Sequence, residues 1–201
     1  MSKNLDASKL PDYSYEFKSP LWWGIIGLVT VEGTVVATLI ASFFYLQGNH
    51  AAWPPAGTNP PELLLPTLST LVLLASMVPV YLTDKAFKSG NPEPLGRLPL
   101  FSILLALIFL AIKAYEYGGH IDFRWDTHAY GSVVWLMIGF HSAHVIAVIL
   151  KTLVIVYLAR KHYFTPEKRI AVTVNGLYWY FVAAAWIPLY LTIYWGSRIW
   201  G

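Results

Sequence analysis

Glu32 is a carboxyl group in a position where membrane proteins seldom keep one. It lies within the apolar run 21–46, ~16 Å from the start of a helix that rises about 1.5 Å per residue, which is close to the middle of a bilayer. Insertion of a carboxyl group at that depth is costly, so Glu32 is a candidate functional residue.

Two histidines offer a partner for this carboxyl group. His141 and His144 lie three positions apart in a second apolar run and therefore share a helix face. If that run begins near Tyr130, His141 is ~16 Å deep, as deep as Glu32 is from the other side. We therefore expect Glu32 to contact His141, with His144 as the alternative. Such a pair would satisfy both polar groups and could hold a proton, or it could serve packing alone.

Three other charged residues lie within the apolar runs: Lys113, Glu116 and Lys151. Lys113 and Glu116 form an i,i+3 pair near the predicted outer membrane edge, where we expect them to reach the interface. Lys151 is expected to extend toward the inner interface. The remaining histidines lie in or beside loops and are expected to be solvated: His50, His120, His128 and His162.

This set of residues argues against a catalytic centre. One carboxylate and two imidazoles could ligate a transition metal, but no further ligand lies at matching depth, so we predict no metal site. Haem and copper in a membrane enzyme need imidazoles from several facing helices, and here one span supplies both. The sequence also lacks a dinucleotide fingerprint, a phosphate loop and a nucleophile–base arrangement. We predict no catalytic residue and no cofactor bound by this chain.

The composition indicates which elements must position these groups. Of 201 residues, 56% are hydrophobic and only 12% charged, which is typical of polytopic membrane proteins. Cysteine is absent, which excludes disulfides and thiolate metal sites. We predict an all-α fold: a polar tail over residues 1–20, without a cleavable signal peptide, and a bundle of five transmembrane helices over residues 21–201. The spans are expected at about 21–46, 62–82, 98–117, 130–158 and 173–195.

The distribution of lysine and arginine predicts an orientation. One side of the predicted topology has only Arg124 and Arg198, whereas the other has ten basic residues: Lys3, Lys9, Lys18, Lys85, Lys88, Arg97, Arg160, Lys161, Lys168 and Arg169. The positive-inside rule then places the N-terminus in the cytoplasm and the C-terminus outside. We expect a multi-pass protein of the bacterial inner (plasma) membrane.

Several motifs, in order, resemble subunit III of the haem-copper oxidases, in its five-span form. The most specific is Gly139-Phe140-His141-Ser142-Ala143-His144-Val145, close to the family pattern Gly-Phe-His-x-x-His-Val. The first span resembles the family helix with a carbodiimide-reactive glutamate at the position of Glu32. Further similar stretches are Trp53-Pro54-Pro55 with the start of the next span, Glu116-Tyr117, Tyr178-Trp179-Tyr180-Phe181-Val182 and Tyr194-Trp195-Gly196.

The chain also departs from the family pattern. Thr173, Tyr180 and Ala183 stand where the family commonly has Glu, His and Asp, which removes polar partners from the last span. Lys113 stands where a glutamine is usual, and it can balance the charge of Glu116.

The resemblance implies a subunit without its own catalytic centre in a respiratory oxidase that couples O2 reduction to proton pumping. It implies packing on the haem-bearing subunit I beside subunit II, with haem and copper in those partners, and no nucleic-acid partner. It also implies bound phospholipid, with Trp22, Trp23 and Trp53 as candidate lipid contacts, and a role in sustained proton uptake and in stability. Glu32 and His141 would be the buried polar pair.

Other functions stay open at this stage. An accessory subunit of nitric oxide reductase has the same five-span form. A small proton-conducting or transport protein would use Glu32 and His141 as its relay, and an assembly factor would leave the mature enzyme. The electron donor, cytochrome c or quinol, is also open, although the Trp-Pro-Pro loop favours cytochrome c.

Overall fold

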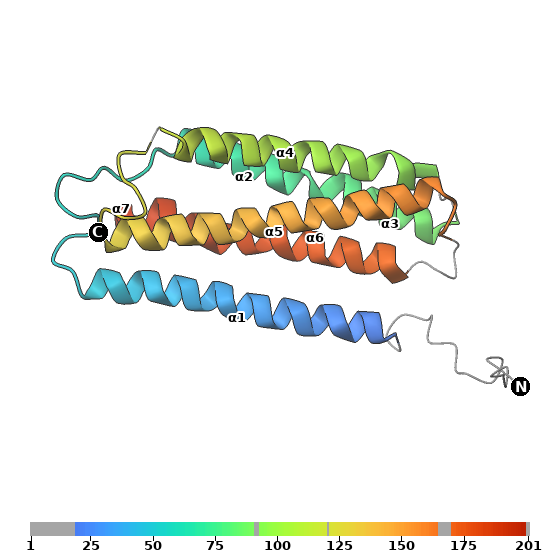
Figure 1. Cartoon of the computed structure of the whole chain (residues 1–201), viewed down its shortest axis with the longest axis horizontal. Helices are drawn as coiled ribbons and strands as arrows, with labels where there is room; N and C mark the ends of the chain where they lie inside the picture. The colour runs from blue at the N-terminus through green and yellow to red at the C-terminus, as the bar shows by residue number, and fades with distance from the viewer. Residues whose placement is uncertain (1–18, 91–92, 120, 165–169, 200–201) are drawn as a thin grey trace, which may run out of the picture.

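The computed structural model describes residues 19–90, 93–119, 121–164 and 170–199, and these form helices joined by loops (Figure 1). Five helical segments are long and apolar enough to cross a membrane. They are α1 (Pro20–Gly48), α2 with α3 (Leu64–Ala75 and Met77–Lys88), α4 (Leu98–Tyr117), α5 (Ala129–Arg160), and α6 (Ile170–Tyr190) with its extension. The extension comprises a wide π-type turn, η5 (Leu191–Gly196), and α7 (Ser197–Ile199); a short 3-10 turn, η3 (Glu93–Gly96), precedes α4. The predicted all-α fold with five spans is confirmed.

Local sequence signals set the beginnings of α1 and α5. Ser19 caps α1 by accepting a hydrogen bond from the backbone N–H of Leu21, and Pro20 fills the first helical position, where no N–H is needed. His128 caps α5 through Nδ1, which accepts from the N–H of Gly131 at 2.9 Å. A Cβ on Gly131 would lie 2.3 Å from the carbonyl oxygen of Arg124, so the tight entry into α5 requires glycine.

The second span is interrupted between α2 and α3. Ser76 separates the two helices, and Pro79 follows in the first turn of α3, where its missing N–H breaks the ladder of backbone hydrogen bonds. Trp179 on α6 donates its indole N–H to Ser76 Oγ at 2.9 Å. The span runs to Lys88 rather than ending near residue 82, because Asp84 and Lys88 pair one helical turn apart and support a polar final turn.

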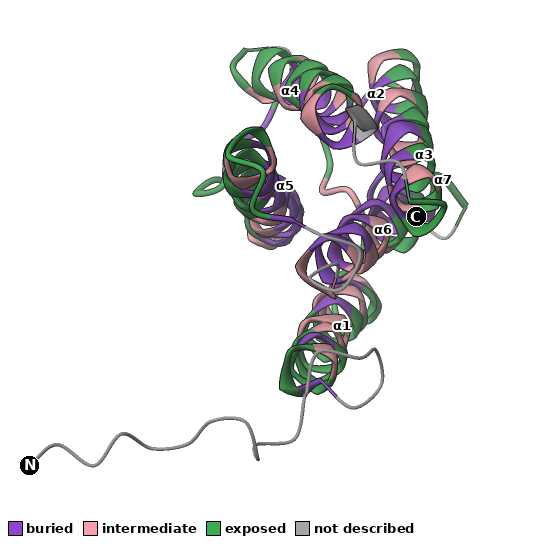
Figure 2. Cartoon of the chain, turned by 90° about the vertical axis from the view of Figure 1, so that its right-hand side faces the viewer, coloured by how far each residue is buried: buried purple, intermediate pink, exposed green. Residues whose placement is uncertain are grey.

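α6 is the central helix and α1 the outermost. Half of the most apolar stretch of α6 is buried, against 11% of that of α1, which packs mainly along α5 and α6 (Figure 2). The largest fully buried side chains are aromatic: Trp179, Trp186, Tyr130, Tyr194, Phe43 and Phe109. α1 therefore adds one face to a bundle that α2 to α6 form among themselves.

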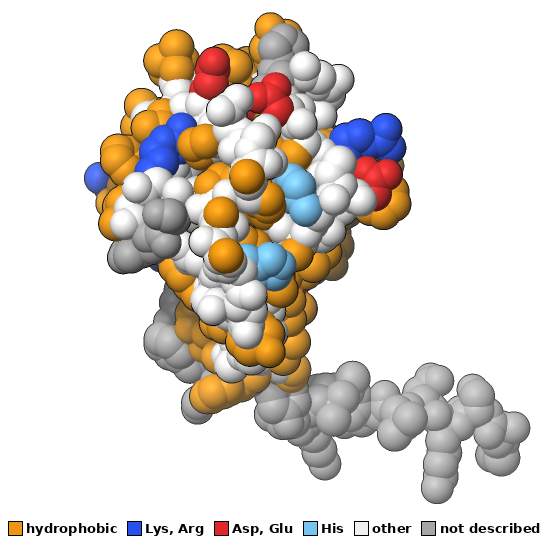
Figure 3. Space-filling model, turned by 90° about the vertical axis from the view of Figure 1, so that its left-hand side faces the viewer, with side chains coloured by type: hydrophobic (Ala, Val, Ile, Leu, Met, Phe, Trp, Pro, Cys, Tyr) orange, Lys and Arg blue, Asp and Glu red, His pale blue; other side chains and the backbone are white. Residues whose placement is uncertain are grey.

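Charge differs between the two ends of the bundle. The end at which α1 begins has five described basic residues in or beside the helix ends: Lys85, Lys88, Arg97, Arg160 and Lys161. The opposite end, with loops 49–63 and 118–128, has Arg124 and Arg198, together with acidic and histidine side chains (Figure 3). Lys3, Lys9, Lys18, Lys168 and Arg169, which also entered the orientation argument, lie outside the described residues. The described residues thus preserve the asymmetry on which the predicted orientation depends.

Candidate functional site

Glu32 lies on the buried face of α1, between α5 and α6. That face repeats at helical spacing through Ile25, Glu32, Val36 and Phe43. The carboxyl oxygen Oε1 accepts a hydrogen bond from the hydroxyl of Tyr178 on α6 at 3.0 Å, and the Glu32 side chain is only 15% exposed. The sequence motif that contains Tyr178 gave no sign that this residue is a partner of Glu32.

His144, rather than His141, faces this carboxyl group. Its Nε2 lies 3.6 Å from Glu32 Oε1, and its Nδ1 lies 2.7 Å from the carbonyl oxygen of Phe140. A carbonyl oxygen only accepts, so Nδ1 carries a hydrogen and Nε2 of the neutral ring is a bare acceptor. Two acceptors would then face each other, unless one proton resides on either Nε2 or the carboxylate. The geometry therefore brings the imidazole and the carboxyl group next to each other without a direct hydrogen bond between them.

His141 points to a different part of the bundle, which corrects the expected Glu32–His141 contact. Its Nε2 donates to the carbonyl oxygen of Val182 at 3.0 Å, and its ring lies 4.6 Å from the Trp186 ring and 5.7 Å from that of Phe109. Two residues three positions apart are rotated by about 60° around a helix. Equal depth thus left the rotation of α5 undetermined, and this rotation directs His144 toward α1 and His141 toward α4 and α6.

Both histidines nevertheless line one small cavity with Glu32. Apolar side chains, among them Val36, Phe181 and Leu189, complete its wall. Glu32 Oε2 and His141 Nδ1 are buried and have no hydrogen-bond partner among the described residues. The three predicted residues are therefore brought together around one space, with a single direct polar approach between Glu32 and His144.

A lysine extends this polar cluster toward the surface. Lys151 on α5 places Nζ 4.2 Å from the centre of the Tyr178 ring, whose hydroxyl donates to Glu32. The Lys151 side chain is exposed, whereas Tyr178 is only 3% exposed. We define the Glu32 cluster as Glu32, His144, Tyr178 and Lys151.

Lys113 and Glu116 form the predicted pair, but in a buried position. Nζ and Oε2 lie 2.7 Å apart, and both side chains are less than a tenth exposed. The hydroxyl of Tyr194, on the π-type turn, accepts from Lys113 at 2.9 Å and donates to Glu116 at 2.7 Å. Lys113 Nζ also lies 5.0 Å from the centre of the Trp186 ring. The expectation that the pair reaches the interface is wrong, because Tyr194 and Trp186 enclose it within the bundle.

The three tryptophans that were expected to contact lipid differ in their burial. Trp53 is 3% exposed and packs edge-on against Phe43 and Tyr130, so it is a core residue rather than a lipid contact. Trp22 is half-buried and Trp23 is exposed.

The histidines that were expected to be solvated also differ in their burial. His128 is half-buried as the cap of α5, with Nε2 3.2 Å from Thr58 Oγ1, which corrects the expectation of a solvated side chain. His50 and His162 are exposed. His120 lies outside the described residues.

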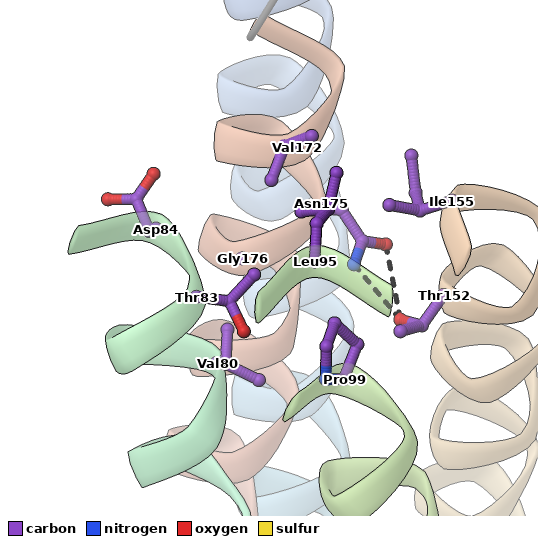
Figure 4. Close-up of a pocket in the computed structure, with 10 residues that line it drawn as sticks. All are labelled: Val80, Thr83, Asp84, Leu95, Pro99, Thr152, Ile155, Val172, Asn175 and Gly176. Atoms are coloured by element: carbon purple, nitrogen blue, oxygen red, sulfur yellow. Dashed lines mark hydrogen bonds between the residues drawn. The ribbon is translucent and has the colours of Figure 1, made fainter. Parts of the chain in front are cut away.

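Other hydrogen bonds of α6 partly replace the polar contacts that the last span was expected to lack. Thr173 donates to Asp84 at 3.2 Å. Asp84 lines a small pocket between α3, η3, α4, α5 and α6 (Figure 4). In the same pocket the amide of Asn175 donates to Thr152 Oγ1 at 3.0 Å. Tyr180 is half-buried, and Ala183 is buried. Across residues 19–90, 93–119, 121–164 and 170–199, no three His, Asp or Glu side chains gather in a way that could hold a metal ion.

Comparison with known proteins gives one consistent result. The sequence matches the family model for cytochrome c oxidase subunit III over residues 7–198. It is 29% identical to cytochrome c oxidase subunit 3 of Thermostichus vulcanus over 185 residues, which cover 91% of this chain and 90% of the relative. It is 34% identical to the subunit 3 of Rattus norvegicus over 183 residues, which cover 87% of this chain and 69% of the relative. The Synechocystis protein of the same name is 28% identical over 86% of this chain and 74% of its own length.

Proposed function

Because the chain belongs to the cytochrome c oxidase subunit III family, we propose that it packs on the haem-bearing subunit I, beside subunit II, and supports proton uptake there. Membership of the family makes it a subunit of a respiratory oxidase complex. The observation that carries the functional part is the position of Glu32, in the middle of an apolar helix and held by Tyr178 and His144. A carboxyl group is retained at such depth at a substantial cost, which favours a role beyond packing.

The proposed role of the Glu32–His144 pair is to hold one proton within the membrane. The tautomer that Phe140 imposes on His144 leaves room for one proton between the two groups. Carboxylates and imidazoles are the groups that proton relays in membranes use. The pair lies on the two sides of one helix interface, so a proton can move between them without a change of backbone.

We further propose that the N-terminus lies in the cytoplasm of a bacterium and that the membrane is the inner (plasma) membrane. The support is the excess of basic residues at the end where α1 begins, five described residues against two. α1 offers a broad apolar surface to neighbouring subunits or to phospholipid, since most of its residues outside the α5 and α6 contacts are exposed. Trp23 at its beginning is the candidate for a lipid contact at the interface.

The functional part is tested by turnover of the intact oxidase with Glu32→Gln in this subunit. Glutamine keeps the size and the acceptor for Tyr178 but cannot hold the proton. We expect the variant complex to start at a rate near that of the wild type and then to lose activity faster during sustained turnover. Glu62→Gln is the matched control, because Glu62 is exposed in a loop. Equal inactivation rates in Glu32→Gln and wild type would exclude the proton role.

A further inference from the structure

The pocket between α3, η3, α4, α5 and α6 has polar groups in its wall, although it lies inside an apolar bundle (Figure 4). Its volume is about 20 Å³. A single water molecule needs roughly 10–15 Å³ and two to four polar partners. Three polar side chains of the wall are almost fully buried: Thr83, Thr152 and Asn175, with exposed fractions of 4%, 1% and 6%. The pocket is therefore large enough for one water molecule and polar enough to hold it.

Asn175 has a donor in this pocket that the described residues leave unused. Its Nδ2 donates to Thr152 Oγ1 at 3.0 Å, and its Oδ1 lies 3.4 Å from the same oxygen atom. A carboxamide has two N–H groups, and Thr152 Oγ1 is the one acceptor that Nδ2 has among the described residues. An amide N–H that is buried without an acceptor is costly, and most of all in a membrane-spanning bundle. The second N–H therefore favours a ligand that accepts a hydrogen bond.

Thr83 offers an acceptor from the other side of the pocket. Its hydroxyl donates to the carbonyl oxygen of Pro79, one turn earlier on α3, at 2.7 Å. A hydroxyl group has one hydrogen and two lone pairs, so Thr83 Oγ1 can still accept. Figure 4 shows this hydroxyl and the Asn175 amide on two sides of the pocket. Because a water molecule both accepts and donates, it can join the two groups.

A metal cation fits the pocket less well. Asp84 is the only carboxylate among the residues that line it. Its Oδ2 lies 2.7 Å from Nζ of Lys88, and its Oδ1 accepts from Thr173 at 3.2 Å. The unused group of Asn175 is a donor, and a cation needs oxygen ligands.

We propose that the pocket binds one ordered water molecule, which accepts from Asn175 Nδ2, donates to Thr83 Oγ1 and so joins α6 to α3. Buried water commonly completes the hydrogen bonds of polar groups that a fold leaves unpaired. The site shares no residue with the Glu32 cluster. It therefore depends neither on the proposed proton role nor on a partner subunit.

Crystallography of the full-length chain in a lipid mesophase, at a resolution that shows ordered water, tests the assignment. We expect one isolated density peak at about 2.5–3.2 Å from both Asn175 Nδ2 and Thr83 Oγ1. Thr83→Val keeps the shape of the side chain but removes the acceptor, so it is expected to lose the peak. Thr83→Ser keeps the hydroxyl group and is expected to retain it.

Thr38→Val is the matched control, because the Thr38 hydroxyl also donates to the carbonyl oxygen four residues earlier, at 2.8 Å, but on the exposed face of α1. It is expected to leave the peak unchanged. A wild-type pocket without density, while other buried water molecules are visible, would overturn the assignment. Density that extends as a chain, or a peak that persists in Thr83→Val, would overturn it as well. The wild-type density alone shows whether water is bound, so the test does not depend on how well the variants fold.

Discussion

Loss of Lys113 tests how far the buried ion pair depends on both of its partners. Lys113→Met removes the cation and leaves Glu116, 5% exposed, with the hydroxyl of Tyr194 as its remaining donor. Removal of one partner of a buried pair costs about 3–5 kcal/mol, because the other charge stays uncompensated in a weakly polar environment. The contact of Lys113 with the Trp186 ring is lost as well, which contributes about 1 kcal/mol. We therefore expect a loss of about 4–6 kcal/mol in the free energy of unfolding.

A stepwise series separates the charge from the packing. Lys113→Met with Glu116→Met removes both charges and is expected to recover most of the stability, since apolar replacements of a buried pair are often neutral. About 1–2 kcal/mol of loss is expected to remain, because the hydroxyl of Tyr194 keeps only the distant hydroxyl of Tyr117, 3.4 Å away. Tyr194→Phe added to the double variant is expected to recover that part.

The assay is denaturant unfolding of the chain in mixed micelles, followed by helix content. Lys161→Met at the exposed end of α5 is the control and is expected to stay within about 0.5 kcal/mol of the wild type. A loss of less than about 1 kcal/mol in Lys113→Met would refute the reasoning. A double variant less stable than Lys113→Met alone would refute it as well.

Two further predictions concern the beginning of α5 and the 49–63 loop. Gly131→Ala is expected to destabilise the chain by about 1–3 kcal/mol, because its Cβ would meet the carbonyl oxygen of Arg124, whereas Gly139→Ala, with open space around it, is expected to be neutral or slightly stabilising. Equal effects of the two substitutions on thermal unfolding would contradict the close approach at the start of α5. Arg198→Met removes the hydrogen bond from Nη2 to the carbonyl oxygen of Pro61 at 2.6 Å and is expected to speed limited proteolysis of the 49–63 loop. An unchanged cleavage rate would show that this bond does not hold the loop.

The sequence predicted five apolar helices and a position for Glu32 near the middle of the first, because both follow from the lengths of the apolar runs. It did not predict which histidine faces Glu32, since a depth argument leaves the rotation of α5 about its axis free. Tyr178 was missed as a partner for a related reason. An aromatic residue on an apolar helix looks the same whether its hydroxyl donates to a carboxylate or lies at the interface.

For the Lys113–Glu116 pair, the sequence predicted the contact but not its surroundings. The i,i+3 spacing predicted the contact itself, but its burial depends on Tyr194, which comes from the π-type turn 78 residues later in the chain than Glu116. A pair near the end of a span carries no local sign of what encloses it. Trp53 was misassigned to the lipid for the same reason, because the rings of Phe43 and Tyr130 that cover it belong to other elements.

The central claim is that this chain works as subunit III on a haem-bearing subunit I. The most direct measurement is purification of the tagged chain from native membranes in mild detergent, with a reduced-minus-oxidised optical spectrum of the eluate and identification of the proteins that elute with it. The account predicts haem bands together with the subunits I and II of one oxidase. A stable eluate without haem and without those subunits would contradict it.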